Sequence, residues 1–326
     1  MPRLKAPITL LVCGCVTLGA KEEGMTSSAL GHRHTITAVA VTPGLLATGD
    51  MKGEVLLWNT SPLAPRAQLE PPGERSRIQD LSFSLKGDLA IATDWTGEVE
   101  LWSGERHLRT LRAYTGRATA LAWTPEGLLV TGGGDLDPNA AEAEDAPNDE
   151  GPPLRGWVKV WANETPRLTL AHSSSSIGAL AVSADGRWLA AGADEEVRVW
   201  TLPAGDLHAR FSELGEITAL DFGPVGLIAV GSKGLRVLSP GVAQPGPVQA
   251  VRAPAAAGLS ADRVYAGGYE RIMVYRLPDL SPLADLPGRL YDAAPSEAGI
   301  WLAFADRLLL LDTDGAPVLE RSVRVP

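Results

Sequence analysis

Residues 45–59, LLATGDMKGEVLLWN, decide the fold, because the same unit returns as LAIATDWTGEVELWS at 89–103 and as LAAGADEEVRVWT at 189–201. Each copy holds two apolar runs separated by a turn with acidic or glycine residues, and the second run ends in tryptophan. Another apolar run and a turn precede each copy, so one unit comprises three strands in about thirty residues. Recurrence at a fixed period is the sequence signature of a repeat architecture.

Seven first strands recur along the chain at intervals of roughly forty residues. They are ITAVAV at 36–41, IQDLSF at 78–83, ATALAW at 118–123, IGALAV at 177–182, EITALDF at 216–222, VQAVRA at 248–253 and LYDAA at 290–294. An insertion at 135–155 lengthens the interval before the fourth of them. The interval before the sixth is short, so we expect the fifth unit to have a vestigial outer strand.

The third strands, such as EVRVW at 196–200 and LLLLD at 308–312, are apolar on both faces. A strand buried on both sides needs cover above and below, and radially packed blades provide it. We therefore predict an all-β fold in which residues 25–326 form one seven-bladed β-propeller with three to four antiparallel strands per blade. The C-terminal run at 317–325 is expected to supply the outer strand of the last blade, and the alternative is the N-terminal run MTSSALGH at 25–32.

The chain resembles the WD-repeat family. The resemblance rests on Gly31-His32, on the TP and DG turns, and on a tryptophan at the end of four third strands, which are Trp58, Trp102, Trp161 and Trp200. It implies a binding platform rather than an enzyme. It also implies a buried hydrogen-bond network, for which His32, Thr48 and Trp58 are the candidate members, and a turn aspartate six residues before the tryptophan, which only Asp194 matches.

Charge and cysteine content narrow the function classes. The net charge of -10 lacks the positive field that binds phosphate backbones, so we expect no nucleic-acid partner. Both cysteines, Cys13 and Cys15, lie near the start, which leaves the repeats without a thiol. No G-x-S-x-G elbow, P-loop or dinucleotide fingerprint occurs, so we expect no cofactor.

The insertion at 135–155 is required by no blade and carries seven acidic side chains against one Arg155. The acidic residues are Asp135, Asp137, Glu142, Glu144, Asp145, Asp149 and Glu150. They are candidate contacts to a partner protein with a basic surface, and the alternative is a solvated loop. Trp95, in the turn before a third strand, is a second candidate anchor, and packing against the adjacent blade is its alternative.

Metal binding and catalysis find little support in the pattern. Asp135, Asp137 and Asn139 alternate as calcium ligands do, but Ala140 and Ala146 stand where a calcium loop needs Gly and Glu, so we expect no metal site. We expect a monomeric, non-catalytic interaction scaffold. The alternative is a hydrolase-like or lyase-like propeller enzyme with carboxylates and histidines converging at the central channel.

Residues 1–24, MPRLKAPITLLVCGCVTLGAKEEG, are unlike the repeats and have the layout of an export signal. A positively charged start precedes an uncharged run at 6–20, which is too short to span a membrane as a helix. LVCGC at 11–15 resembles a bacterial lipobox, which implies lipidation of Cys15. We expect a protein of the cell envelope or periplasm, attached to the membrane only through that lipid. The alternative is a cytoplasmic propeller, with an extra strand here or a chain that starts at Met25.

Overall fold

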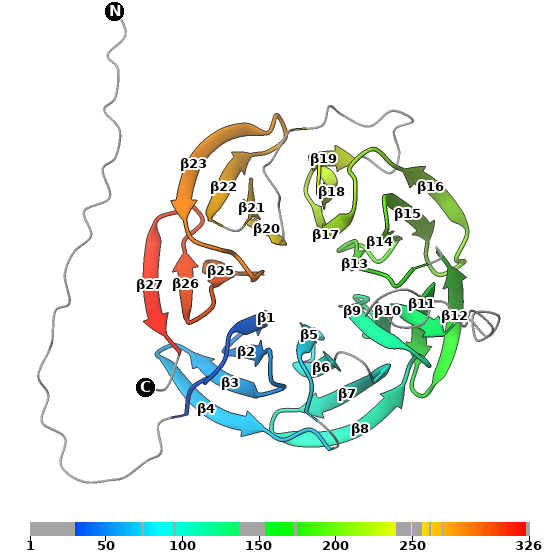
Figure 1. Ribbon diagram of the computed structural model, residues 1–326, viewed down its shortest axis with the longest axis horizontal. Helices are drawn as coiled ribbons and strands as arrows, with labels where there is room; N and C mark the ends of the chain where they lie inside the picture. The colour runs from blue at the N-terminus through cyan, green and yellow to red at the C-terminus, as the bar shows by residue number, and fades with distance from the viewer. Residues whose placement is uncertain are drawn as a thin grey trace, which may run out of the picture.

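The computed structural model is a ring of seven antiparallel β-sheets around a central channel (Figure 1). In the part of the chain that it describes, every assigned element is a strand, and no helix is long and apolar enough to cross a membrane. The described residues are 30–72, 75–93, 96–136, 154–172, 175–238, 249, 256–260, 262–268 and 270–323. The predicted all-β, seven-bladed fold is confirmed.

The strands of each sheet follow the chain from the channel to the rim. The first four sheets are β1 (Ile36–Thr42), β2 (Leu45–Asp50), β3 (Val55–Thr60), β4 (Leu63–Leu69); β5 (Ile78–Phe83), β6 (Asp88–Thr93), β7 (Glu98–Ser103), β8 (Arg106–Arg112); β9 (Arg117–Trp123), β10 (Leu129–Leu136), β11 (Leu154–Ala162), β12 (Thr165–Ala171); and β13 (Ala179–Val182), β14 (Trp188–Ala193), β15 (Glu196–Thr201), β16 (Leu207–Phe211). The last three sheets are β17 (Ile217–Gly223), β18 (Gly226–Gly231), β19 (Gly234–Leu238); β20 (Ala256–Ser260), β21 (Arg263–Gly267), β22 (Arg271–Arg276), β23 (Ser281–Pro287); and β24 (Asp292–Ser296), β25 (Gly299–Ala303), β26 (Arg307–Leu311), β27 (Pro317–Ser322).

The hydrophobic core of the described residues is divided into seven clusters, one at each seam between neighbouring blades. The seam between blades one and two, for example, packs Leu57 and Leu69 of the first sheet against Leu81 and Ile91 of the second. Each sheet contributes one face to the seam before it and the other face to the seam after it. This arrangement explains why the third strands are apolar on both faces.

Close approach at four of these seams requires glycine in the second strand of a blade, and Gly49 and Gly192 illustrate it. A Cβ atom on Gly49 would lie 2.5 Å from Cγ2 of Ile78, the first residue of the next inner strand. A Cβ atom on Gly192 would lie 2.3 Å from Cγ2 of Ile217 in the same way. The glycine therefore lets the branched side chain of the following blade pack directly against the backbone.

One strand assignment made from the repeats is wrong. The inner strand of the sixth blade is β20 at Ala256–Ser260 and not the run at 248–253. Gln249 instead forms a two-hydrogen-bond bridge with Leu235 of β19, on the rim side of blade five. The apolar run at 248–253 resembled an inner strand because apolar alternation does not distinguish an inner from an outer strand. The expected vestigial outer strand of blade five falls on 239–248, which lie outside the described residues.

The ring closes where the last blade meets the first (Figure 1). As predicted, the C-terminal run forms the outer strand of blade seven, because β27 pairs with β26. The backbone N–H of His32 donates to the carbonyl of Val323 at 2.7 Å, and that of Ile36 donates to Ala305 at 3.2 Å. No chain link joins these two blades, so noncovalent contacts alone hold this seam.

Candidate functional site

The implied network is complete in blade one and includes an aspartate that the sequence pattern did not assign. Nε1 of Trp58 donates to the hydroxyl of Thr48 at 2.8 Å, and that hydroxyl lies 2.7 Å from Nε2 of His32. Nδ1 of His32 lies 3.3 Å from a carboxylate oxygen of Asp50. Burial opposes ionisation of Asp50, but the His32 side chain and the backbone N–H groups of Glu54 and Lys52 outweigh it and lower the pKa of Asp50.

An ionised Asp50 accepts a hydrogen bond from Nδ1–H of His32. Nε2 of His32 then accepts a hydrogen bond from the hydroxyl of Thr48, whose oxygen accepts one from Nε1–H of Trp58. The chain of bonds fixes the turn after β2 to the segment that precedes β1. Asp50 escaped the sequence analysis because it lies eight residues before Trp58 and not six. Its place at the end of β2 is what brings it to His32.

Blade three builds the same connection with a different residue. The hydroxyl of Tyr114 lies 2.9 Å from Oγ1 of Thr131, which accepts from Nε1 of Trp161 at 2.9 Å. In blade four Nε2 of His172 donates to the carbonyl of Ala191 at 3.0 Å. Asp194, which matched the family position, contacts Ser175.

Asp135 proves to be a structural residue at the base of the inserted hairpin. It pairs with Arg155 across β10 and β11, and its carboxylate accepts from the N–H of Thr115 at 2.8 Å and from Nζ of Lys159 at 3.1 Å. Lys159 also donates to the carbonyl of Ala113 at 2.6 Å. These bonds hold the carboxylate of Asp135, whose side chain is 27% exposed, against its neighbours at this edge of blade three. The other candidate contacts, Asp137, Glu142, Glu144, Asp145, Asp149, Glu150 and Trp95, lie outside the described residues, as does Cys15.

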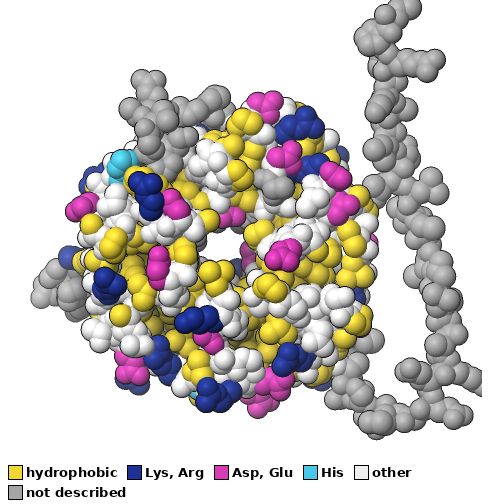
Figure 2. Space-filling view, turned by 180° about the vertical axis from the view of Figure 1, so that it is seen from behind, with side chains coloured by type: hydrophobic (Ala, Val, Ile, Leu, Met, Phe, Trp, Pro, Cys, Tyr) yellow, Lys and Arg dark blue, Asp and Glu magenta, His cyan; other side chains and the backbone are white. Residues whose placement is uncertain are grey.

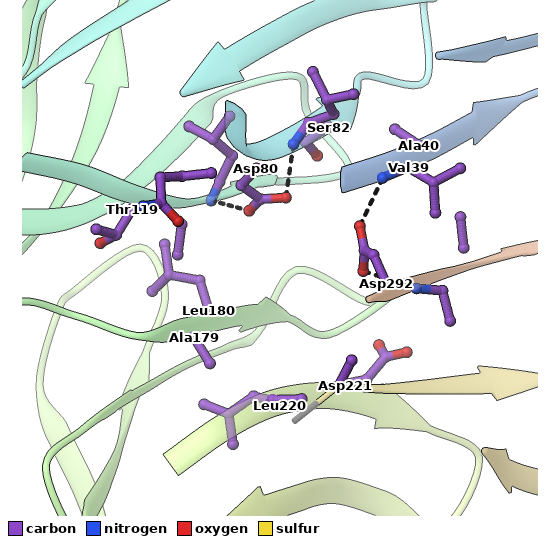
Figure 3. A pocket seen from close by; sticks show the side chains of 18 of the residues that line it. Val39, Ala40, Asp80, Ser82, Thr119, Ala179, Leu180, Leu220, Asp221 and Asp292 are labelled. Carbon is purple, nitrogen blue, oxygen red and sulfur yellow. Dashed lines mark hydrogen bonds between the residues drawn. The ribbon is translucent and has the colours of Figure 1, made fainter. Parts of the chain in front are cut away.

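The central channel, about 640 Å³ in volume, holds three carboxylates that the sequence analysis did not single out (Figure 3). Asp80 of β5 and Asp292 of β24 each accept two backbone N–H bonds, whereas Asp221 of β17 points into the channel (Figure 3). The signal was present, since Asp80 and Asp292 stand at the same place in IQDLSF and LYDAA, two residues after Ile78 and Leu290.

The three channel carboxylates do not converge. Within the described residues, His32, Asp50 and Glu54 are the one group of three whose possible ligand atoms lie within 4.8 Å of one another. Both ring nitrogens of His32 in that group are engaged by Thr48 and Asp50. The channel itself is open at the centre of the face seen in Figure 2.

An apolar groove of about 1020 Å³ lies over the closing seam, at the ends of the blades opposite the inserted hairpin. The turns that follow the inner strands of blades seven, one and two meet there with the outer turn of blade one, at 60–63, and with Val318 and Leu319 of β27. Its exposed apolar side chains are Pro43, Pro62, Leu85, Pro295, Ala298 and Val318. Leu85 is 82% exposed and Val318 is 59% exposed.

Comparison with known families agrees with this geometry. Residues 164–201 match the WD domain, G-beta repeat. The matched segment comprises β12 and the three inner strands of blade four, so the sequence repeat is offset from the blade and bridges two neighbouring sheets. No curated protein matches the chain. The repeat match at 164–201 and the seven-bladed ring together support a propeller of the WD-repeat kind.

Proposed function

We propose that the protein is a non-catalytic protein-interaction platform whose docking surface is the apolar groove over the closing seam. WD-repeat propellers commonly serve as interaction scaffolds. The observation that carries the proposal is the exposure of Leu85 and Val318 on the rim of one continuous groove. Large apolar side chains that gather at a concave surface mark protein-binding sites, whereas isolated ones are ordinary.

The occupant is an apolar segment of a partner protein with a basic residue at its edge. Nearly all groove-lining side chains are apolar or uncharged, and Glu297 is the charged one among them. A basic residue placed opposite Glu297 would fix the orientation of the segment, while burial of Leu85 and Val318 would supply the affinity.

The test compares Leu85→Glu and Val318→Glu with Leu108→Glu, a leucine that is 41% exposed on β8 and outside the groove. Cross-linking in the native host should recover the same partner with the wild type and with Leu108→Glu. The amount of that partner recovered should fall at least tenfold with either groove variant, because a charge in the groove opposes apolar burial. Direct binding of that partner's purified segment completes the test. Equal recovery of the partner with all variants would overturn the assignment of the groove as the docking surface. If neither the wild type nor any variant recovers a partner, the proposal of an interaction platform is overturned.

The acidic insertion connects Leu136, the last residue of β10, to Leu154, the first residue of β11, and these two residues lie on the face opposite the groove. We propose that it contacts a basic protein surface, and that such binding weakens as salt rises, since the Debye length falls from about 10 Å at 0.1 M to roughly 3 Å at 1 M. Because Leu136 and Leu154 are paired, the deletion that tests this should replace 137–153 with a two-residue Asn-Gly turn. Tight binding to DNA or RNA at physiological salt would refute the assignment of a protein partner.

Export with lipid attachment at Cys15 remains a proposal that rests on the leader-like residues 1–24. Mass spectrometry of the mature N-terminus decides it. An intact Met1, or a chain that begins at Met25, recovered from the soluble cytoplasmic fraction would end the lipoprotein assignment.

A further inference from the structure

Asp292 ties the last blade to the first from inside the channel (Figure 3). One carboxylate oxygen accepts the N–H of Val39 in β1 at 2.7 Å, and the other accepts the N–H of Ala293 in its own strand at 2.8 Å. The N–H of Val39 lies on the channel-facing strand of blade one, where no further strand is available to pair with it. The carboxylate thus adds a link at the seam that no chain segment bridges.

Asp80 repeats this arrangement at the seam between blades two and three. Its carboxylate accepts the N–H of Leu121 in β9 at 2.7 Å and the N–H of Leu81 in β5 at 2.7 Å. At the same repeat position blades one, three, four and five carry Ala38, Ala120, Ala179 and Ala219. Asp80 and Asp292, here called the two clasps because each carboxylate links its own blade to the next, are therefore additions to the repeat and not part of its common pattern.

Charge on Asp80 and Asp292 is costly first because these carboxyls are buried and then because Asp292 adds a like charge near Asp80. Among the described residues, the titratable groups that line the channel are Arg77, Asp80, Asp221, Tyr291 and Asp292, and Arg77, the cationic one of these, is exposed. Burial raises the pKa of Asp80 to about 8, with the charge of Asp292 as the second cause. Burial also raises the pKa of Asp221 and of Asp292 to about 7.

The direction of the pH effect follows from these shifts. A carboxyl whose pKa is raised by folding contributes stability that is fully present below the ordinary value of 3.8 and is lost as pH rises through the folded value. Between about pH 6 and pH 9 the three channel carboxyls ionise, and the charge of Asp292 then opposes that of Asp80. The amide bonds to Leu121 and Val39 oppose this loss without cancelling it.

We propose that Asp80 and Asp292 are conformational clasps that make closure of the ring sensitive to pH. When they are neutral, a carbonyl oxygen still accepts the amide of the next blade and the channel holds no net negative charge. When they and Asp221 are ionised, repulsion inside the ring makes the seams at Val39 and Leu121 open more readily. The ring is thus tightest in mild acid and loosens above neutral pH.

Hydrogen exchange of the Val39 and Leu121 amides tests the proposal on the full chain. Protection factors, corrected for intrinsic exchange, should fall at least tenfold from pH 6 to pH 9 in the wild type. They should change little in the double variant Asp80→Asn with Asp292→Asn, because an amide oxygen can accept the same bond without charge. Asp206→Asn, an exposed aspartate on a distant turn, is the control and should behave as the wild type.

Asp221→Asn provides an independent arm, since it removes a channel charge and touches neither clasp. It should raise protection at pH 9 at both amides and leave protection at pH 6 unchanged. Protection that stays constant or rises with pH in the wild type would overturn the proposal. The same fall in the double variant as in the wild type would overturn it as well, and the Asp221→Asn result decides the matter if the double variant does not fold.

Discussion

Blades one and two carry the same repeat unit from the second strand to the tryptophan, yet the indole N–H of that tryptophan has different surroundings in the two blades. In blade one the indole N–H of Trp58 donates to Thr48. In blade two the equivalent position is Ile91, and Nε1 of Trp102 is buried without a hydrogen-bond partner. Trp102 instead packs edge-on against His107, with ring centroids 5.0 Å apart.

The carboxylates of the two blades differ as well. Asp50 of blade one is held ionised by the bonds described above. Glu100 of blade two is buried against His107, with the hydroxyl of Thr110 3.0 Å from both of its oxygens. Burial outweighs these bonds and raises the pKa of Glu100. The comparison shows that the tryptophan holds the same position in both blades, whereas the polar side chains around it differ from one blade to the other.

The largest expected effect concerns the packing of blade one on blade two. Gly49→Ala should lower the free energy of unfolding by about 3 kcal/mol, because the new methyl group would overlap Ile78. Blade two carries Ala92 at this position, in one cluster with the small Ala118. Ala92→Gly is the matched variant and should cost about 1 kcal/mol. Urea unfolding measures the free energy of unfolding of both variants. Equal losses of stability would show that Ile78 moves aside for the new methyl group at little cost.

The next effect isolates the indole hydrogen bond. Trp58→Phe and Trp102→Phe remove similar buried volume, but only the first leaves the hydroxyl of Thr48 without its donor. Trp58→Phe should therefore cost about 1 to 2 kcal/mol more than Trp102→Phe in the free energy of unfolding. A larger loss for Trp102→Phe would mean that its indole N–H is satisfied in solution.

The smallest effect is a pair of opposite pH dependences. The pKa of Asp50 is lowered, so its stabilisation is present above 3.8 and is lost as pH falls, and Asp50→Asn should flatten stability on the acid side. The pKa of Glu100 is raised, so its contribution is present below 4.5 and is lost as pH rises, and Glu100→Gln should flatten that decline. Thermal unfolding from pH 3 to pH 8 measures both, and parallel curves for the two variants would contradict the assignment.

Much of the fold was predictable because it depends on local pattern. Seven units whose third strands are apolar on both faces indicate radially packed sheets. The resemblance to the WD-repeat family also made His32, Thr48 and Trp58 recognisable as members of one hydrogen-bond network. The inner strand of blade six was misplaced because the apolar run at 248–253 fits either of two positions in a blade. Asp50 was missed because its contact with His32 depends on where β2 ends. Asp80 was missed although Asp292 occupies the same repeat position, because the sequence does not show that this position faces the amide of the next blade.

The sequence by itself determined the repeat, the number of blades and the absence of a thiol from the repeats, whereas the structure chose the C-terminal run over the N-terminal one as the strand that completes the last blade. The properties that the sequence determined follow from composition and from periodicity within about forty residues. Only the tertiary structure decided that Asp292 would contact Val39, that three carboxylates would line one channel, and that Leu85 and Val318 would line one apolar groove. These contacts are between residues far apart in the chain, which come within contact distance only when the blades pack into a closed ring.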